Sequence, residues 1–134
     1  MPEVLEKAVN SSAANVTVTT TTETVAISSG RVPIPVATCR AVIRAWCQLT
    51  LGTATTTVTP RIRRGTAITD PLIGEANAEQ IKTAAGSTEP FDLRTGESLQ
   101  DRESVEYSFT VQQAAATANG TVLQADIEVE ILNG

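Results

Sequence analysis

The most regular pattern in the chain is an alternation of apolar and other residues from Cys39 to Leu51. Every odd-numbered position in this segment is apolar, whereas the even-numbered positions are mixed: Arg40, Val42, Arg44, Trp46, Gln48 and Thr50. Successive side chains of a β-strand point to opposite faces of its sheet, so a period of two indicates a strand with one buried face. Pro35 before the segment and Gly52 after it favour a strand over a helix. We therefore predict one long strand here.

A second alternating segment runs from Thr121 to Leu132. One face of this predicted strand is apolar and would point to the core: Leu123, Ala125, Ile127, Val129 and Ile131. The other face carries an acidic row: Asp126, Glu128 and Glu130. Same-face residues lie about 6.6 Å apart along a strand, a spacing that suits a carboxylate pair or calcium ligands. A solvated outer face is the simpler interpretation, and we predict that.

The rest of the chain has shorter alternating stretches separated by turn residues. Strands are predicted around residues 16–27, 55–64, 66–73, 78–83, 88–93 and 104–112. The two prolines of Arg31–Val36 suit an extended connection, and Thr95–Ser98 and Asp101–Glu103 are predicted to form a polar loop. About eight strands without a long helix predict an all-β fold, a single antiparallel β-sandwich. Eight strands fit a jelly roll better than a seven-stranded immunoglobulin-like domain.

The first fifteen residues differ in pattern from the rest. We predict an N-terminal arm at residues 1–15 and a β-sandwich domain at residues 16–134. Val4, Leu5 and Val9 would lie on one side of a short amphipathic turn. Two interpretations remain open for the arm: it is a frayed terminus, or it packs on a neighbouring subunit through these three residues.

The composition excludes several classes of function. The chain has no histidine, the commonest general base and metal ligand, and its net charge of −5 argues against a nucleic-acid partner. Aromatic residues make up only 3% of the chain, so stacking surfaces for bases or sugars are scarce. No glycine-rich phosphate-binding motif occurs. We expect a protein that is not an enzyme, with no catalytic residues, no metal, no cofactor and no nucleic-acid partner.

The cysteines and the N-terminal residues bear on the cellular compartment. Cys39 and Cys47 lie eight residues apart in one predicted strand, which is about 26 Å, whereas a disulfide joins Cα atoms within about 7 Å. We therefore expect two buried free thiols. The N-terminal residues lack the apolar core of a signal peptide, and no apolar stretch has the length of a membrane span. These features predict synthesis in a cytoplasm and no membrane partner.

Two groups of residues are candidates for an interface. Trp46 lies on the mixed face of its strand with Arg40 and Arg44, where it either fills a second apolar layer or anchors a subunit contact. Tryptophan and arginine are enriched at the centres of protein interfaces. The second group forms the densest basic cluster of the chain, and its members are either interface residues or ion-pair partners: Arg61, Arg63 and Arg64.

The acidic row of the last strand needs basic partners. If that strand lies beside the strand at Cys39–Leu51, the row meets Arg40 and Arg44 across the sheet. These pairs would also fix the register, since a slip of one residue would turn the charges into the core. The alternative is that the row faces Arg61 and Arg63, in the same chain or in another subunit.

Two stretches carry a resemblance to a known group of proteins. They are Tyr107–Gln113 continued by Thr117–Ala125, and Trp46–Thr59 continued by Arg61–Gly65. With their Thr- and Ala-rich short strands, they resemble the small jelly-roll structural proteins of tailed bacteriophages.

The resemblance implies a virion protein that decorates the capsid from outside, after synthesis in the host cytoplasm. Such a head decoration, or cement, protein would form a homo-oligomer, with a homotrimer favoured, and would bind and stabilise the major capsid protein shell. Tail and fibre proteins share the fold, so the alternative is a carbohydrate- or receptor-binding module of a phage tail or fibre.

Overall fold

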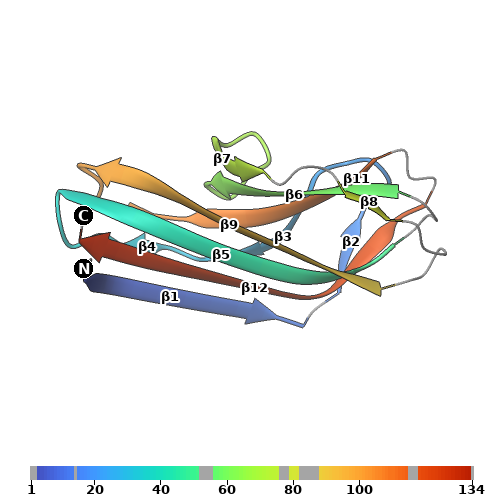
Figure 1. The fold of residues 1–134 in the computed structure, drawn as a ribbon, viewed down its shortest axis with the longest axis horizontal. Helices are drawn as coiled ribbons and strands as arrows, with labels where there is room; N and C mark the ends of the chain where they lie inside the picture. The colour runs from blue at the N-terminus through green and yellow to red at the C-terminus, as the bar shows by residue number, and fades with distance from the viewer. Residues whose placement is uncertain are drawn as a thin grey trace.

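The computed structural model describes residues 3–13, 15–51, 56–75, 79–81, 88–114 and 118–133. Every regular element within these ranges is a β-strand, and the strands pair antiparallel. Figure 1 shows two layers of strands that run along the length of an elongated sandwich. The predicted all-β antiparallel sandwich is confirmed.

Each layer is one sheet. Sheet A has the order β1-β12-β5-β9, with β2 also paired to β12: β1 (Val4–Ser12), β12 (Gly120–Asn133), β5 (Thr38–Thr50), β9 (Thr88–Gln100) and β2 (Val16–Val18). Sheet B has the order β3-β11-β6-β7, with β8 also paired to β6: β3 (Thr24–Ser28), β11 (Tyr107–Ala114), β6 (Thr56–Arg64), β7 (Leu72–Glu75) and β8 (Glu79–Ile81). A separate short pair joins β4 (Val32–Pro33) to β10 (Ser104–Val105).

The strand order is that of a jelly roll. β1 and β2 both pair with β12, and β7 and β8 both pair with β6, so each couple occupies one strand position. We number these strand positions 1 to 8 in the order of the sequence. From one edge to the other, sheet A is then built of positions 1, 8, 3 and 6, and sheet B of positions 2, 7, 4 and 5. Two sheets of four positions, filled by a long hairpin folded over on itself, define the jelly roll.

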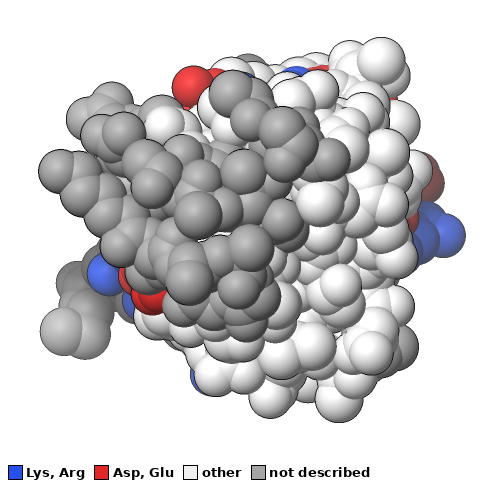
Figure 2. Space-filling view, turned by 90° about the vertical axis from the view of Figure 1, so that its right-hand side faces the viewer, with Lys and Arg blue, Asp and Glu red and all other residues white. Residues whose placement is uncertain are grey.

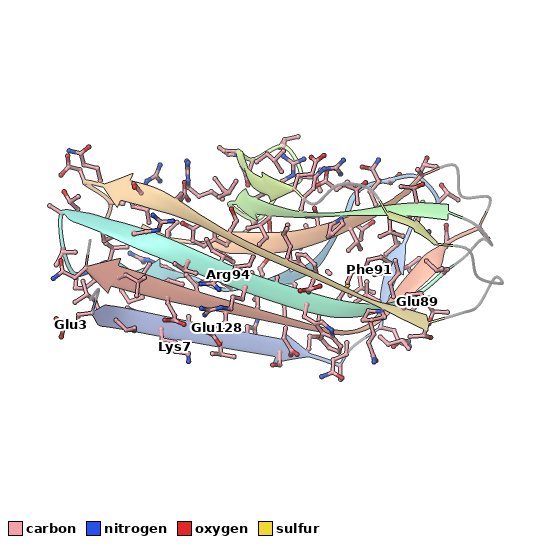
Figure 3. The ribbon with its side chains drawn as sticks, viewed as in Figure 1. Glu3, Lys7, Glu89, Phe91, Arg94 and Glu128 are labelled. Carbon is pink, nitrogen blue, oxygen red and sulfur yellow. The ribbon has the colours of Figure 1, made fainter. Side chains whose placement is uncertain are left out.

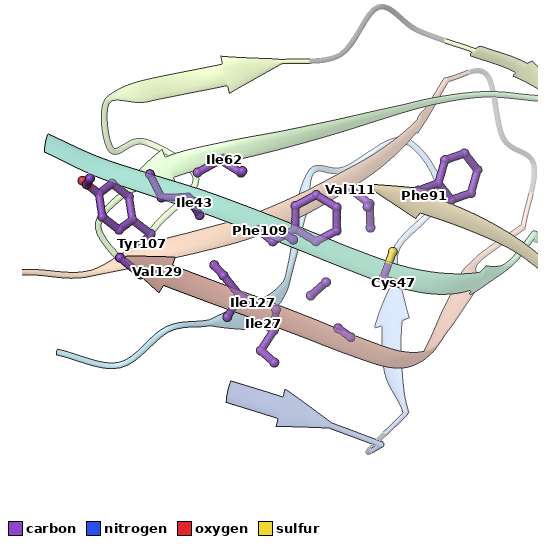
Figure 4. Packing of buried hydrophobic residues seen from close by; sticks show 14 of the residues in the cluster. Ile27, Ile43, Cys47, Ile62, Phe91, Tyr107, Phe109, Val111, Ile127 and Val129 are labelled. Carbon is purple, nitrogen blue, oxygen red and sulfur yellow. The ribbon is translucent and has the colours of Figure 1, made fainter. Parts of the chain in front are cut away.

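The core lies between the two sheets. On β5 the alternate residues are buried as predicted: Cys39, Ala41, Ile43, Ala45, Cys47 and Leu49. Sheet B contributes the alternating residues of β10 and β11 that the sequence also indicated: Val105, Tyr107, Phe109 and Val111. Figure 4 shows Phe109 in the middle of this cluster, where side chains of both sheets meet. The apolar alternation in the sequence therefore marks the inward faces of both layers.

Both thiols are free and buried, as the sequence predicted. Burial raises the pKa of Cys39, and it raises the pKa of Cys47 to about 12. A thiol reacts as its thiolate, so at neutral pH both cysteines stay protonated and inert.

Residues 4–12 adopt a different structure from the predicted amphipathic turn. They form β1, which pairs with β12 along its length and is an edge strand of sheet A. A β-bulge follows Val4, and Val4 and Val9 are both exposed, so this segment shows neither a clean alternation nor a buried stripe in the sequence. The described part of the arm thus belongs to the sandwich. Residues 1, 2 and 14 of the arm lie outside the described residues.

The predicted polar loop at Thr95–Ser98 is wrong. This segment lies inside β9, where it pairs with β5 from Thr95 opposite Ile43 to Ser98 opposite Arg40. The sequence suggested a turn because of Gly96. In the structure a Cβ atom at Gly96 would lie 3.1 Å from the backbone oxygen of Ala41, so the glycine permits close packing against β5.

One residue of the predicted core face of β12 is also misplaced. The register between β12 and β5 shifts between Val122 and Gln124. Val122 is therefore fully buried, whereas Leu123 is only half-buried. An extra residue at a bulge changes which side chains face the core, and the alternation alone does not reveal it.

Candidate functional site

The outer face of sheet A brings together side chains from all four of its main strands. Val9 of β1 lies opposite Glu128 of β12, which lies opposite Arg44 of β5, which lies opposite Arg94 of β9. Among the labelled side chains of Figure 3, Lys7 of β1, Glu128 of β12 and Arg94 of β9 lie on this face. The face opposite the core is therefore a charged surface with one exposed apolar residue in the same row.

The predicted contact between the acidic and basic rows is confirmed. Nη1 of Arg44 donates hydrogen bonds to Oε1 of Glu128 at 3.0 Å and to Oε1 of Glu130 at 2.7 Å. The hydrogen bond from Arg44 holds the pKa of Glu130 below its ordinary value. Nζ of Lys7 lies 3.8 Å from Glu128. Arg40 is exposed on the same face and forms no ion pair with any described residue.

A groove of about 670 Å³ lies on this face beside the ion pairs. Trp46 of β5 lines it and is half-buried. Asp126 of β12 and Asp92 of β9 are the cross-strand partners of Trp46, so one carboxylate lies on each side of the indole. Arg94 and Val9 also line the groove.

Three charged residues around Trp46 have no ionic partner in the described part of the chain. Asp92, Asp126 and Arg94 form no ion pair or side-chain hydrogen bond with other residues in the described ranges. Val9, with 62% of its surface exposed, lies beside them. An aromatic and apolar centre with free charges around it is the arrangement found at protein interfaces.

The second predicted interface group has a structural role instead. Arg61 and Arg63 both bind Glu23, whose side chain is only 10% exposed. Nε and Nη2 of Arg63 donate to the carboxylate at 2.7 and 2.8 Å, Nη1 of Arg61 donates at 3.2 Å, and the Thr110 hydroxyl donates at 2.6 Å. The alternative that the acidic row of β12 faces these arginines is therefore wrong within this chain.

The contacts of Glu23 have an electrostatic consequence. Burial raises its pKa, but the hydrogen bonds from Arg63 and Thr110 and the charges of Arg63 and Arg61 outweigh burial and hold the pKa below the ordinary value of 4.5. The carboxylate is therefore ionised at neutral pH, and together with Glu75, whose Oε2 lies 2.9 Å from Nε of Arg61, it balances the charges of Arg61 and Arg63.

Arg64, the third member of the basic cluster, joins the two sheets. Its Nη2 lies 2.9 Å from Oε1 of Glu97, which belongs to β9 of sheet A. The Tyr107 hydroxyl of β11 donates to Oε2 of the same carboxylate at 2.6 Å. Burial, together with this bond to Glu97, raises the pKa of Tyr107, so the phenol remains a donor. Arg64 thus links the two sheets, and its role at an interface stays a prediction.

Sequence reasoning missed the acidic partners of the basic cluster. The sequence pattern predicts a loop at Glu97, and it indicates no role for Glu23, which lies within a threonine-rich segment. A signal for Glu23 was present, because it is the only charged residue between Lys7 and Arg31. An isolated charge in a neutral strand-forming region is often a buried partner of a distant opposite charge.

The described parts of the chain contain neither a metal-ligand cluster nor a membrane-spanning helix. No group of three or more carboxylates or cysteines there is placed to hold a metal ion. No helix in the same ranges is long and apolar enough to cross a membrane.

Comparison with known proteins adds structural similarity at low identity. No family model matches the chain, and no curated protein matches its sequence. A particle structure of infectious bursal disease virus is 7% identical with a TM-score of 0.47, and it covers 96% of this chain and 35% of the viral chain. A xylan-binding domain from Paenibacillus barcinonensis is 10% identical with a TM-score of 0.38, covering 99% of this chain and 97% of that domain. Pili of Bacillus endospore appendages are 16% identical with a TM-score of 0.39, covering 96% and 91%.

This chain therefore spans about a third of the length of the viral chains. Similarity at this level carries no argument about function. The class of the protein, a jelly-roll β-sandwich, rests on its strand order.

Proposed function

We propose that this chain is a non-enzymatic structural subunit that binds another protein through the outer face of sheet A. The observation that carries the proposal is the groove around Trp46, where Asp92, Asp126 and Arg94 lie with no partner among the described residues. The arginines of β6, by contrast, are paired with Glu23, Glu75 and Glu97. The groove thus combines an aromatic side chain with charged groups that are available to a partner.

The proposed partner is a viral capsid shell, and the proposed role is to decorate and stabilise it from outside. Burial of the groove against the shell would add binding free energy to the assembled state and none to the dissociated subunits. Central tryptophans contribute a large share of such energy because they are rigid and displace water. The bacteriophage, the capsid-exterior location and the major capsid protein belong to this proposal, and they are supported by the resemblance in sequence. The homotrimer predicted from sequence is an alternative to the dimer proposed below, and the sedimentation experiment given there distinguishes the two.

One observation favours a second function, a carbohydrate-binding module of a tail or fibre. An indole flanked by two carboxylates suits a sugar ring, whose face stacks on the indole and whose hydroxyls donate to the carboxylates. The other three aromatic residues are buried: Phe91, Tyr107 and Phe109. Trp46 would thus be the only stacking platform, which makes a sugar site less favoured than a protein interface.

Replacing Trp46 by alanine tests the proposal. We expect Trp46→Ala to weaken binding to purified capsids by about 30-fold or more, which corresponds to about 2 kcal/mol, because the centre of the interface is lost. Co-sedimentation of the protein with capsids measures this. Leu72→Ala is the matched control, since Leu72 is an exposed apolar residue on the other sheet and should bind as the wild type does.

The same proteins applied to a glycan array separate the two functions. Undiminished capsid binding by Trp46→Ala contradicts the proposal. Glycan binding by the wild type that Trp46→Ala abolishes, with no binding to capsids, establishes the second function instead.

A further inference from the structure

The two edges of sheet A differ in how well they are protected against pairing with another strand. β9, one edge, contains Pro90, Gly96 and four charged residues. Proline, glycine and charge are the usual means of blocking an exposed sheet edge. β1, the other edge, has a bulge after Val4, but its remaining residues to Ser12 pair regularly with β12, and the strand has no proline, no glycine and only Glu6 and Lys7 charged. Figure 1 shows β1 along the margin of the molecule, and β12 is the one described strand of sheet A that pairs with it.

The edges of sheet B do not offer a comparable strand. β3 has five residues, β7 has four and β8 has three. Short edge strands present few free backbone groups to a partner. Within the described strands, β1 is therefore the less protected of the two long edges.

β1 also carries exposed apolar side chains. Val4 and Val9 are 49% and 62% exposed, and they are two of the four large apolar side chains that are exposed in the described residues. Val9 projects from the outer face of sheet A, in the row of Glu128 and Arg44. An apolar side chain beside a row of free backbone donors and acceptors is suited to strand addition.

One end of the sandwich, by contrast, shows few charges on its described surface. The surface facing the viewer in Figure 2 is mostly uncharged where it is described, and the charged side chains visible there lie at its margin.

We propose that β1 pairs antiparallel with β1 of a second copy of this chain, about a two-fold axis at Val9. Val9 then lies opposite the partner's Val9, and Lys7 lies opposite the partner's Ser11. No like charges face each other in this register, whereas an axis at Lys7 would bring two lysines together. The pairing gives partners to backbone groups on the open side of both β1 strands and brings the two exposed Val9 side chains together.

Sheet A would continue without a break from one copy into the other. The two Trp46 grooves would then lie on one continuous surface, because Val9 borders the groove in each copy. Two linked binding sites hold a repetitive shell more tightly than one, through the raised effective concentration of the second site. The pairing itself does not depend on what the groove binds.

Cysteine cross-linking tests the pairing and its register. In the proposed register the Cα atoms at position 9 lie about 5 Å apart, within the range of about 4.4–6.8 Å that a disulfide spans. We expect Val9→Cys to give a covalent dimer under mild oxidation on a non-reducing gel. Lys7→Cys is the control, because its two copies would lie four residues apart along the strands, about 13 Å. Cys39 and Cys47 are buried and do not compete.

The mass of the wild-type protein in solution completes the test. We expect sedimentation at micromolar concentration to give twice the chain mass of 14.1 kDa. Val9→Lys, which places a charge at the axis, should shift the mass toward the monomer, whereas Ile68→Lys at another exposed apolar site should not. A monomer or a trimer for the wild type, or cross-linking of Lys7→Cys as efficient as that of Val9→Cys, overturns the proposal.

Discussion

Replacing Phe109 by alanine is expected to lower the free energy of unfolding by about 3–5 kcal/mol. The side chain is fully buried in the central region of the core, on β11 between β3 and β6. Its cross-strand neighbours are Ile27 and Ile62, which are also buried, and the facing sheet closes the site from the other side (Figure 4). Truncation would leave a cavity that two continuous sheets have little freedom to fill.

Urea unfolding followed by circular dichroism measures this effect. Phe109→Leu keeps most of the volume and should cost clearly less than alanine. Leu72→Ala removes an apolar side chain that is 46% exposed, and the change should stay within about 0.5 kcal/mol. A loss below about 1 kcal/mol for Phe109→Ala would mean that the core is not packed as described.

Replacing Glu23 by glutamine is expected to lower the free energy of unfolding at neutral pH by about 2–3 kcal/mol. The change keeps the shape of the side chain but removes the charge that Arg61 and Arg63 bind. These arginines are themselves mostly buried, so water does not readily replace the lost carboxylate. Glu128→Gln is the control, because its partner Arg44 is exposed, and its effect should be much smaller.

The pH dependence gives this prediction a second measurement. The pKa of Glu23 is lower in the folded protein than its ordinary value of 4.5. The carboxylate therefore contributes its full stability above the unfolded pKa, and the contribution is lost as the pH falls through the folded pKa. The stabilities of the wild type and Glu23→Gln should begin to converge as the pH falls below the ordinary value of 4.5, and should meet once the pH has passed the lower folded pKa. A difference between them that stays constant down to pH 2 would exclude an ionised Glu23 as its cause.

The sequence was most informative where a strand lies in the middle of a sheet with one face in the core. β5 is the clearest case, since its odd-numbered residues are buried and its mixed face carries Arg44 and Trp46 outward. The facing acidic residues of β12 follow from the same alternation. Burial on one face imposes the period of two, so the pattern, the register and the Arg44–Glu128 pair are all readable in advance.

Edge strands were harder to predict because only one neighbour constrains them. β1 has Val4 and Val9 in solvent and a bulge between Val4 and Glu6, so its sequence resembles a loose terminal segment. The second half of β9 contains Gly96 and polar residues that are typical of a turn. Only its pairing with β5, across half the chain, makes it a strand.

The candidate site was predicted in part for the same reason. Trp46, Arg44 and Arg40 were assigned to one outward face because they share a strand. Asp92 and Arg94 join that face only through the β5–β9 pairing. For the basic cluster of β6 the sequence leaves two interpretations open, an interface or ion pairs within the chain. The ion pairs could not be predicted because Glu23, the partner of Arg61 and Arg63, lies far away in the sequence, just before β3.

The central claim is that this chain binds a capsid shell through the outer face of sheet A. Electron microscopy of purified particles, prepared with and without the protein, tests it most directly. The account predicts added density at regular points of the shell lattice, into which the sandwich fits with Trp46 toward the shell. Density confined to the tail, or a sandwich whose sheet A face points into solvent, would contradict it.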